Sequence, residues 1–257
     1  MPSSFSHKLT RAMTYLALPF QYPQRGWSLL GQLLADRSLL HELPRLTPHR
    51  DWLRSQGIAT IIDVGSCSGA FAYAMRSILP QAQIYSFEPL QDNFDRLVRN
   101  LSRRGHFQAF NTAIGDRQGE LGFHRNAFSP SSSALEMGEL HRRAFPHTAQ
   151  TTTLNVPVAP LDDFLDRMTL ASKVMLKVDV QGYEDAVLRG ATKILQQVDL
   201  IEIEVSHQPL YEGQVLFDGI YQMLQKAGFR FGGELDNMLS PLDGSILQSD
   251  GLFLRVI

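Results

Sequence analysis

Apolar and polar positions follow two different rhythms along this chain, and the rhythm changes near residue 58. Before that point leucines recur at helical spacing and prolines separate the groups. Residues 1–57 are therefore predicted to form an N-terminal helical extension. The first run, "MPSSFSHKLTRAMTYLALPF", has no continuous apolar core and no small-residue cleavage site, so we expect a helix there rather than a signal peptide.

From residue 58 onward, short β-branched apolar runs alternate with amphipathic helical runs. The strand-like runs are "TIIDVG", "QIYSFEP", "FQAFNTAIGD", "KVMLKVDV" and "DLIEIEV"; the helical runs are "AFAYAMRSIL", "DNFDRLVRNLSRRG", "PLDDFLDRM", "YEDAVLRGATKIL" and "FDGIYQMLQKAG". The last runs, "GFRFGGEL" and "DGLFLRVI", predict an antiparallel pair of strands. Residues 58–257 are thus predicted to form an α/β domain: a seven-stranded, mostly parallel sheet with helices on both faces.

Residues 119–153 break this alternation with a long stretch rich in Ser and Thr. We expect an excursion that carries one short helix over residues 135–145. An ordered excursion of this length is often a lid or a binding loop, although a surface insertion without function fits the sequence as well. The polar candidates on it for contacts with a substrate are Ser131, Ser132, Ser133, His141, Arg142, Arg143 and His147.

Composition and charge narrow the classes of function. The 257 residues are 44% hydrophobic, with a formal net charge of -2 and no Lys/Arg-rich block, which gives no electrostatic footprint for nucleic acid. The one cysteine, Cys67, excludes an intrachain disulfide and a cysteine zinc cage, and favours a cytoplasmic location. No window approaches the roughly 18 apolar residues of a transmembrane helix.

The first predicted strand runs into a glycine turn of a nucleotide-binding type, "IIDVGSCSGAF". Gly65 and Gly69 allow the backbone to approach a ligand closely. The turn lacks the G-x-G-x-x-G of a dinucleotide site and the Gly-Lys-Ser/Thr of a phosphate-binding loop. Asp63 before it would repel a pyrophosphate and suits a ligand with an ammonium group.

Acidic and amide side chains follow the next strands. Glu88 ends the second strand, where a carboxylate is placed to accept hydrogen bonds from both ribose hydroxyls of NAD or S-adenosylmethionine. Asn111 and Thr112 follow the third strand, where an adenine edge would arrive. In the second half of the chain, Asp179 ends a buried strand, and Glu204 and His207 lie near the end of another.

These runs together resemble the FkbM family of S-adenosylmethionine-dependent methyltransferases. The matching pieces are "DVGSCSGAFA", "SFEP", "NTAIGD", "PSSSAL", "LDDF", "LKVDVQGYEDAVLRGA", "IEIEVS" and "SDGLFLR", in the family's order over residues 58–257. The resemblance implies a class I Rossmann-like methyltransferase fold, S-adenosylmethionine as cofactor, and O-methylation of a sugar, glycan or natural-product hydroxyl.

The resemblance also implies roles for individual residues. Asp63, Gly65 and Gly69, with Ser66 and Ser68 between them, would line the methionine end of the cofactor; Glu88 and Pro89 would hold the ribose; Asn111, Thr112 and Ala113 would flank the adenine; and Asp179 would lie beside the methyl group. Family members often have Asn where this chain has Cys67, which puts a polar role of that loop position in doubt.

Methyl transfer to an alcohol benefits from a base that removes the hydroxyl proton. His207 is the first candidate because a histidine is matched to neutral pH. Asp179 would orient the acceptor, or act as the base if His207 faces away, and Glu204 is the third candidate. The same three side chains would suit a divalent metal ion, which the sequence does not require.

Other functions remain open from the sequence. An N-methyltransferase is disfavoured because "DVQGYE" stands where "NPPY" or "DPPY" would follow the fourth strand. An NAD-binding oxidoreductase and a non-catalytic adenosyl-binding module are the further alternatives. The expected partner is a small-molecule or glycan acceptor, and leucines within residues 29–46 are compatible with a homodimer.

Overall fold

The computed structural model describes residues 42–256. Most of the predicted N-terminal helical extension, including Leu29 to Leu40, lies outside the described residues. The part that is described contains two short helices, α3 (Glu42–Leu46) and α4 (Arg50–Ser55).

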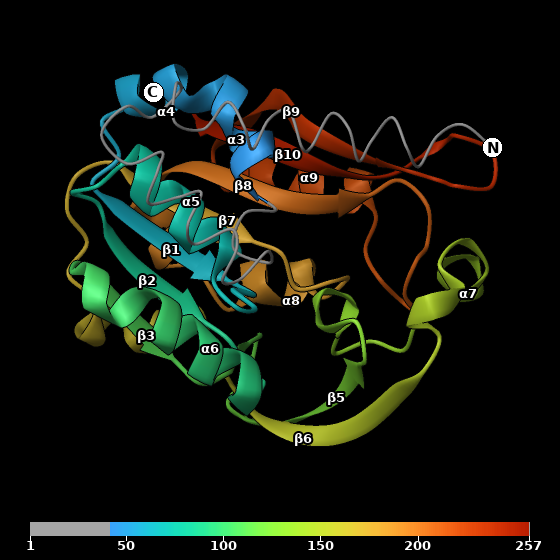
Figure 1. Ribbon diagram of the computed structural model, residues 1–257. Helices are drawn as coiled ribbons and strands as arrows, with labels where there is room; N and C mark the ends of the chain where they lie inside the picture. Colours follow the sequence, from blue (N-terminus) through green and yellow to red (C-terminus); the bar gives the residue numbers. More distant parts are fainter. Residues whose placement is uncertain (1–41, 257) are drawn as a thin grey trace.

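A twisted seven-stranded sheet forms the centre of the protein (Figure 1). Its strands lie in the order β3-β2-β1-β7-β8-β10-β9. The first five in that order run parallel, and β10 is antiparallel to both of its neighbours. The strands are β1 (Thr60–Val64), β2 (Gln83–Phe87), β3 (Phe107–Phe110), β7 (Val174–Val178), β8 (Val198–Ser206), β9 (Phe229–Leu239) and β10 (Ile246–Arg255). The predicted sheet and its antiparallel final pair are confirmed.

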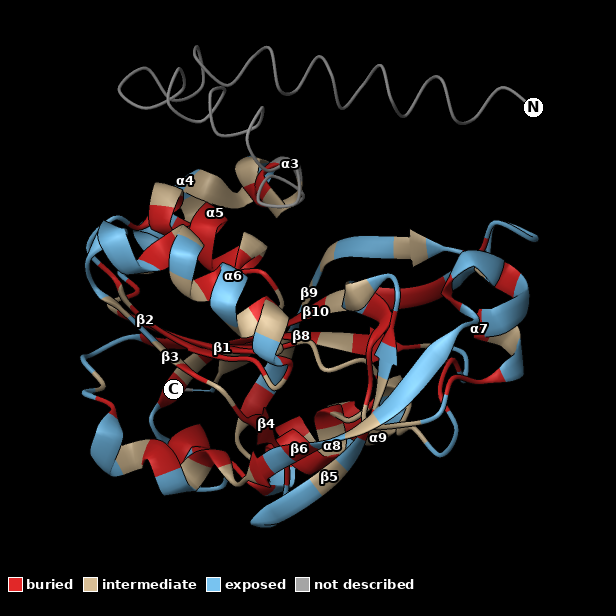
Figure 2. Cartoon of the chain, turned by 60° about the horizontal axis from the view of Figure 1, so that its bottom comes forward, coloured by how far each residue is buried: buried red, intermediate tan, exposed pale blue. Residues whose placement is uncertain are grey.

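Helices cover both faces of this sheet, as predicted. One face packs against α3, α4, α5 (Ala70–Ile78) and α6 (Gln91–Leu101) through one apolar core. The other packs against the 3-10 helix at Leu161–Arg167, α8 (Glu184–Arg189) and α9 (Phe217–Lys226) through a second core. Figure 2 shows that the central strands are the most deeply buried part of the chain.

The described part of the extension shares a core with the sheet. Leu43, Leu46 and Leu53 are buried in the same cluster as Ile61 of β1. Burying leucine side chains contributes about 1.5–3 kcal/mol each. Residues 42–57 are therefore packed as an integral part of the α/β fold.

The predicted excursion differs from expectation, because it starts as a strand. β5 (Gly119–Asn126) pairs antiparallel with β6 (Thr151–Ala159), and β6 pairs with the two-residue β4 (Ala113–Ile114) in a separate three-stranded sheet. The sequence signal is weak because little of β5 is apolar; Leu121 and Phe123 pack inward from it. Between the strands, α7 (Glu139–Ala144) is shorter than the helix predicted over 135–145.

Two further boundaries differ from the sequence prediction. The run "FQAFNTAIGD" forms β3 and β4, which belong to different sheets. The helix predicted over residues 183–195 ends at Arg189 in the structure. At the next position, a Cβ on Gly190 would overlap the carbonyl oxygen of Gly115, so the chain requires glycine there and turns.

Candidate functional site

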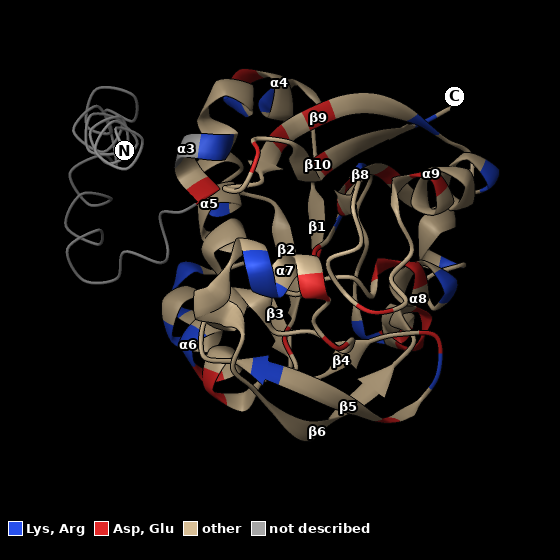
Figure 3. Cartoon of the chain, turned by 90° about the vertical axis from the view of Figure 1, so that its right-hand side faces the viewer, with Lys and Arg blue, Asp and Glu red and all other residues tan. Residues whose placement is uncertain are grey.

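An open cavity lies where the parallel strands β1, β2 and β7 end, with about 660 Å³ of space that includes open solvent. It lies under the excursion, whose residues Phe123, Pro130 and Ala134 form part of its wall. In Figure 3, which looks onto this edge of the sheet, α7 lies in front of the strand ends.

Gly65 brings the two strand ends of the cavity together. Its φ is +86°, and a Cβ there would overlap the backbone carbonyl oxygen of Asp179. Its N–H, like that of Ser66, donates to the carbonyl oxygen of Phe87 at the end of β2. The turn after β1 is therefore fastened to both neighbouring strands, as a preformed ligand corner requires.

Six of the residues predicted to bind the cofactor line the cavity: Gly65, Glu88, Pro89, Thr112, Ala113 and Asp179. Asp63, Ser66, Ser68, Gly69 and Asn111 do not line it. Asp63 is fully buried beneath the turn, and burial raises its pKa to about 6 against the opposing charge of Lys177. Ser66 donates to the backbone oxygen of Asp63, and the backbone oxygen of Ser68 accepts from Asn100.

Glu88 places a buried carboxylate in the cavity wall. Its Oε2 accepts the N–H of Cys67 at 2.8 Å, and its Oε1 accepts the N–H of Leu90 at 2.9 Å and Nδ2 of Asn93 at 3.3 Å. Burial raises the pKa of Glu88 to about 7, although these donors act in the opposite direction. A carboxylate oxygen has two lone-pair sites, so Oε2, which accepts one bond, retains capacity for a ligand hydroxyl.

The side chains predicted to meet an adenine are directed mainly at backbone. Asn111 Nδ2 donates to the carbonyl oxygens of Glu88 and Pro89, at 2.9 and 3.1 Å. Thr112 Oγ1 donates to the carbonyl oxygen of Pro157 at 3.1 Å. Asn111 thus stabilises the turn after β2. Thr112 and Ala113 line the cavity, but the Thr112 hydroxyl is already bonded to the backbone.

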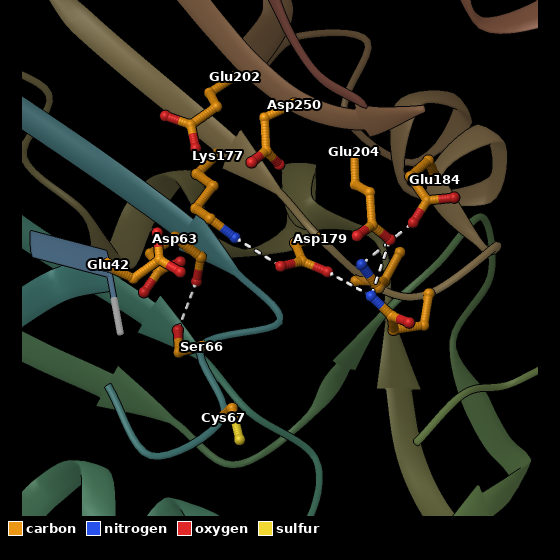
Figure 4. Close-up of polar contacts among 12 residues, drawn as sticks. Glu42, Asp63, Ser66, Cys67, Lys177, Asp179, Glu184, Glu202, Glu204 and Asp250 are labelled. Atoms are coloured by element: carbon orange, nitrogen blue, oxygen red, sulfur yellow. Dashed lines mark hydrogen bonds and ion pairs between the residues drawn. The ribbon is translucent and has the colours of Figure 1, made fainter. Parts of the chain in front are cut away.

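Asp179 is the centre of a polar network at the end of β7 (Figure 4). Its Oδ2 accepts from Nζ of Lys177 at 3.0 Å, and its Oδ1 accepts from Nε2 of Gln181 at 2.9 Å. The same Gln181 nitrogen donates to Oε2 of Glu204 at 2.7 Å. Burial, then repulsion from Asp179 and Glu184, raises the pKa of Glu204 well above its ordinary value. The structure therefore brings together Asp179 and Glu204, two of the three candidate bases.

His207 is separated from this pair. Its Nε2 lies 2.7 Å from Oγ of Ser249, and its ring packs 5.5 Å from the ring of Phe217. Because the Ser249 hydroxyl donates to Oδ1 of Asn237, the histidine Nε2 is left as the donor in its contact with Ser249. His207 does not line the cavity, so the sequence-based preference for it as the base has no geometric support.

Asp179, Glu204 and His207 do not form a metal centre. Across residues 42–256, no three or more His, Cys, Asp or Glu side chains are grouped so that they could hold a metal ion. Among the same residues, no helix has the length and apolar character needed to cross a membrane.

Several site residues were missed from the sequence. Gln181 has a φ of +58° and projects its amide between two carboxylates, and Asn93 joins Glu88 to the excursion through Oγ of Ser129 at 2.7 Å. The spacing of Asn93, five residues after Glu88 in the first turn of a helix, is a signal that could have indicated it.

Hydroxyl groups of Ser133, on the excursion, and of Tyr211, after β8, both bond to Gln181. Ser133 Oγ donates to the backbone oxygen of Gln181 at 2.6 Å, and Tyr211 OH donates to Oε1 of Gln181 at 2.8 Å. The excursion also carries other residues that the sequence suggested for contacts with a substrate. Of these, His141 is buried against the rings of Phe145 and Tyr211, and burial lowers its pKa to about 4. Arg142, Arg143 and His147 are exposed, and Ser131 and Ser132 are buried, with Ser132 in the cavity wall.

Comparison with known proteins gives a consistent result. Residues 63–231 match the family described as "Methyltransferase FkbM domain". The chain is 28% identical over 170 residues to the 2-O-methyltransferase NoeI of Sinorhizobium fredii, covering 64% of this chain and 70% of that protein. It is 26% identical over 145 residues to the hexuronic acid methyltransferase AglP of Haloferax volcanii, covering 56% of this chain and 54% of that protein.

Among solved structures, the chain is similar to the bifunctional kinase-methyltransferase WbdD. That alignment has a TM-score of 0.46 at 14% identity, and it covers 83% of this chain and 39% of the other.

Proposed function

The chain belongs to the FkbM methyltransferase family, and on that premise we propose that it methylates a hydroxyl oxygen of a sugar, glycan or natural product. The protein is an S-adenosylmethionine-dependent methyltransferase. The acceptor class is supported by two relatives, one named as a 2-O-methyltransferase and one as a hexuronic acid methyltransferase. The observation that carries the proposal is Asp179, a carboxylate in the cavity wall held by a lysine and an amide.

The cavity fits an adenosyl group better than a nucleotide with phosphates. Glu88 would hold the ribose hydroxyls, and Leu90, Thr112 and Ala113 would flank the base. The buried carboxylates of Asp63 and Glu88 would repel phosphates and favour the ammonium and sulfonium groups. When bound, S-adenosylmethionine supplies an electrophilic methyl group on sulfur.

We assign the base to Asp179. One third of its side-chain surface is exposed, and each of its oxygens already accepts one hydrogen bond. A carboxylate oxygen has two lone-pair sites, so either oxygen has room for an acceptor hydroxyl. Asp179 would accept the hydroxyl proton as the acceptor oxygen takes the methyl group that the bound cofactor supplies; the sulfur–methyl bond would break as the oxygen–methyl bond forms, and the leaving group would be neutral S-adenosylhomocysteine.

Lys177 and Gln181 prepare Asp179 for this step. They fix the carboxylate from two sides, so that an acceptor meets it in one orientation, and orientation supplies much of the acceleration in such reactions. Glu204 shares the Gln181 amide but does not line the cavity, so it acts on Asp179 through that amide rather than on the acceptor.

The remaining proposals concern the type of acceptor, the cellular compartment and the oligomeric state. The acceptor is a small molecule or glycan rather than nucleic acid, which the net charge of -2 supports. The single cysteine supports the cytoplasm as compartment. A homodimer stays a prediction.

An acceptor screen tests the proposal. The purified protein is incubated with S-adenosylmethionine and panels of sugars, uronic acids, glycans and amine-bearing analogues, and release of S-adenosylhomocysteine is measured. We expect turnover with a hydroxylated acceptor and a product whose added methyl is on oxygen by NMR. Turnover confined to amines would contradict the proposal.

A further inference from the structure

One face of the sheet carries a row of charged side chains across neighbouring strands. Asp63 of β1 is the register partner of Lys177 of β7, and Lys177 is the register partner of Glu202 of β8. On the next strand Asp250 is paired with Glu204. Register partners project from the same face of a sheet, so these groups lie side by side.

The row is covered by α3, a helix that lies before the region matched by the family. Leu43 and Leu46 of α3 contribute to the apolar core, whereas Glu42 and Arg45 reach the charged row. Figure 4 shows Lys177 extending toward Asp179, with Glu42 and Asp63 on one side and Glu202 and Asp250 on the other. Among the described residues, the two cations Arg45 and Lys177 thus lie in one charged cluster with six carboxylates: Glu42, Asp63, Asp179, Glu202, Glu204 and Asp250.

Arg45 holds the carboxylates on the far side of Lys177. Its Nη2 lies 2.7 Å from Oε1 of Glu202, its Nη1 lies 3.3 Å from Oδ2 of Asp250, and it also pairs with Glu42. The side chain of Glu202 is 1% exposed, and that of Arg45 is 8% exposed. Water therefore has little access to Glu202 to replace the guanidinium, and a buried carboxylate without a cation is strongly disfavoured.

Lys177 is the other cation within reach of these carboxylates. Burial lowers its pKa, but Asp179, Asp63 and Glu202, in that order, raise it, and the outcome is a pKa above the ordinary value. Lys177 thus remains an ammonium that several carboxylates attract. Its Nζ lies 3.0 Å from Oδ2 of Asp179, while Glu202 attracts it from the neighbouring strand.

We propose that Arg45 is a positioning residue for methyl transfer: by holding Glu202 and Asp250, it leaves the Lys177 ammonium to Asp179. The inference rests on the proposed function, because it concerns the carboxylate assigned as base. Without Arg45, Lys177 is drawn toward its register partner Glu202, and the negative charge of Asp179 loses its compensation. α3 then has a role in the chemistry besides packing.

The test compares two cofactor analogues that differ in charge at the reacting position. S-adenosylhomocysteine is a neutral thioether there, and sinefungin has an ammonium-bearing carbon in place of the sulfonium. Their shared parts meet the same residues, so the ratio of their Kd values reports the charge near the methyl position. Calorimetry measures both ligands on wild type, Arg45→Gln, Arg45→Gln/Glu202→Gln and the control Arg54→Gln, whose arginine lies on α4 and bonds the carbonyl of Ile78.

We expect Arg45→Gln to increase the preference for sinefungin by roughly fivefold or more, since a carboxylate that has lost its cation attracts the ligand's ammonium group more strongly. Adding Glu202→Gln restores the wild-type ratio, because the charge that competes for Lys177 is gone. Arg54→Gln leaves the ratio unchanged. An unchanged ratio in Arg45→Gln, or a change that Glu202→Gln does not reverse, would overturn the proposal.

Thermal melting shows whether each variant folds. Should Arg45→Gln not fold, Arg45→Lys is used: it keeps one positive charge but lacks the two separate nitrogens that contact Glu202 and Asp250, so the preference for sinefungin should rise by a smaller factor, and an unchanged ratio overturns the proposal. Failure of the wild type to bind either ligand would contradict the proposed function itself. Normal wild-type binding with no effect of the variants contradicts the role of Arg45 alone.

Discussion

The hydroxyl of Tyr211 donates a 2.8 Å hydrogen bond to Oε1 of Gln181, and this contact fixes the direction of the Gln181 amide. With the oxygen engaged, Nε2 is turned toward Asp179 and Glu204, and it donates to both. Two neighbouring carboxylates that would repel each other are thus joined by one amide. The base of the proposed reaction is therefore held by a residue whose own orientation is set from outside the cavity.

Replacing this amide is expected to impair turnover. Gln181→Met keeps the length of the side chain but removes the donor shared by Asp179 and Glu204. Hydrogen bonds to charged groups contribute about 1.5–3 kcal/mol, so we expect kcat to fall roughly tenfold or more. Tyr211→Phe, which retains the amide and loses only its orienting bond, should cost less. Steady-state kinetics with the acceptor from the screen checks this, and a Gln181→Met enzyme with wild-type kcat would contradict it.

A matched pair of substitutions tests whether Asp179 or His207 is the base. Asp179→Asn removes the proposed base, and general-base assistance contributes about 10²–10⁴-fold, so kcat should fall by that order. His207→Gln should leave kcat close to wild type, because the ring contacts Ser249 and Phe217 rather than the cavity. The Kd of S-adenosylhomocysteine checks that each variant retains its cofactor site. A larger loss in His207→Gln than in Asp179→Asn would refute the assignment.

Cofactor affinity is expected to depend on pH through Glu88. Burial raises the pKa of Glu88 to about 7, so the carboxylate is protonated as the pH falls through that value. A protonated carboxyl accepts ribose hydroxyls less well, and the Kd of S-adenosylhomocysteine should rise between about pH 8 and about pH 6. Calorimetry at both pH values measures the slope. Glu88→Gln should bind more weakly and without this slope; the same slope in the variant would assign it to another group.

The raised pKa of Glu88 also predicts the direction in which the free energy of unfolding changes with pH. A carboxyl whose pKa is higher in the folded state binds its proton more tightly there. Its contribution to the free energy of unfolding therefore decreases as the pH rises from its ordinary value of 4.5 to about 7. Glu88→Gln should flatten this part of the stability profile, measured by urea unfolding in the absence of ligand.

Alanine substitutions at two glycines separate the stability cost of close packing from the cost of a strained backbone conformation. Gly65 and Gly57 both have positive φ, but a Cβ at Gly65 would overlap the carbonyl of Asp179, whereas nothing lies within 4 Å of a Cβ at Gly57. Gly57→Ala should cost about 1 kcal/mol from strain. Gly65→Ala should cost roughly 1–3 kcal/mol more from overpacking, and should also weaken S-adenosylhomocysteine binding. Equal losses of stability on denaturant unfolding would show that the overlap is relieved.

The sequence was sufficient for the sheet and for the corner at Gly65, because short β-branched apolar runs and a glycine turn are local signals. His207 could not be placed, because its orientation depends on register between strands. Lys177 and Glu202 are partners, so Glu204 projects from the same face as Asp179. His207, three residues further along, falls on the opposite face, as strand alternation requires.

The charged row and the strand β5 within the predicted excursion could not be predicted from the sequence, for a related reason. Arg45 meets Glu202 across 157 positions of the chain, and an isolated Glu42–Arg45 pair in a helical segment is typical of an exposed surface. β5 has few apolar residues because its other side faces solvent, so it reads as a polar loop. Both depend on long-range packing rather than on local pattern.

The most direct test of the account is the crystal structure of the protein with S-adenosylhomocysteine. We expect the ribose hydroxyls within hydrogen-bonding distance of Glu88 and the sulfur directed toward Asp179 in the cavity under the excursion. A ligand bound elsewhere, or one that leaves Glu88 without a ribose contact and its sulfur remote from Asp179, would contradict the account.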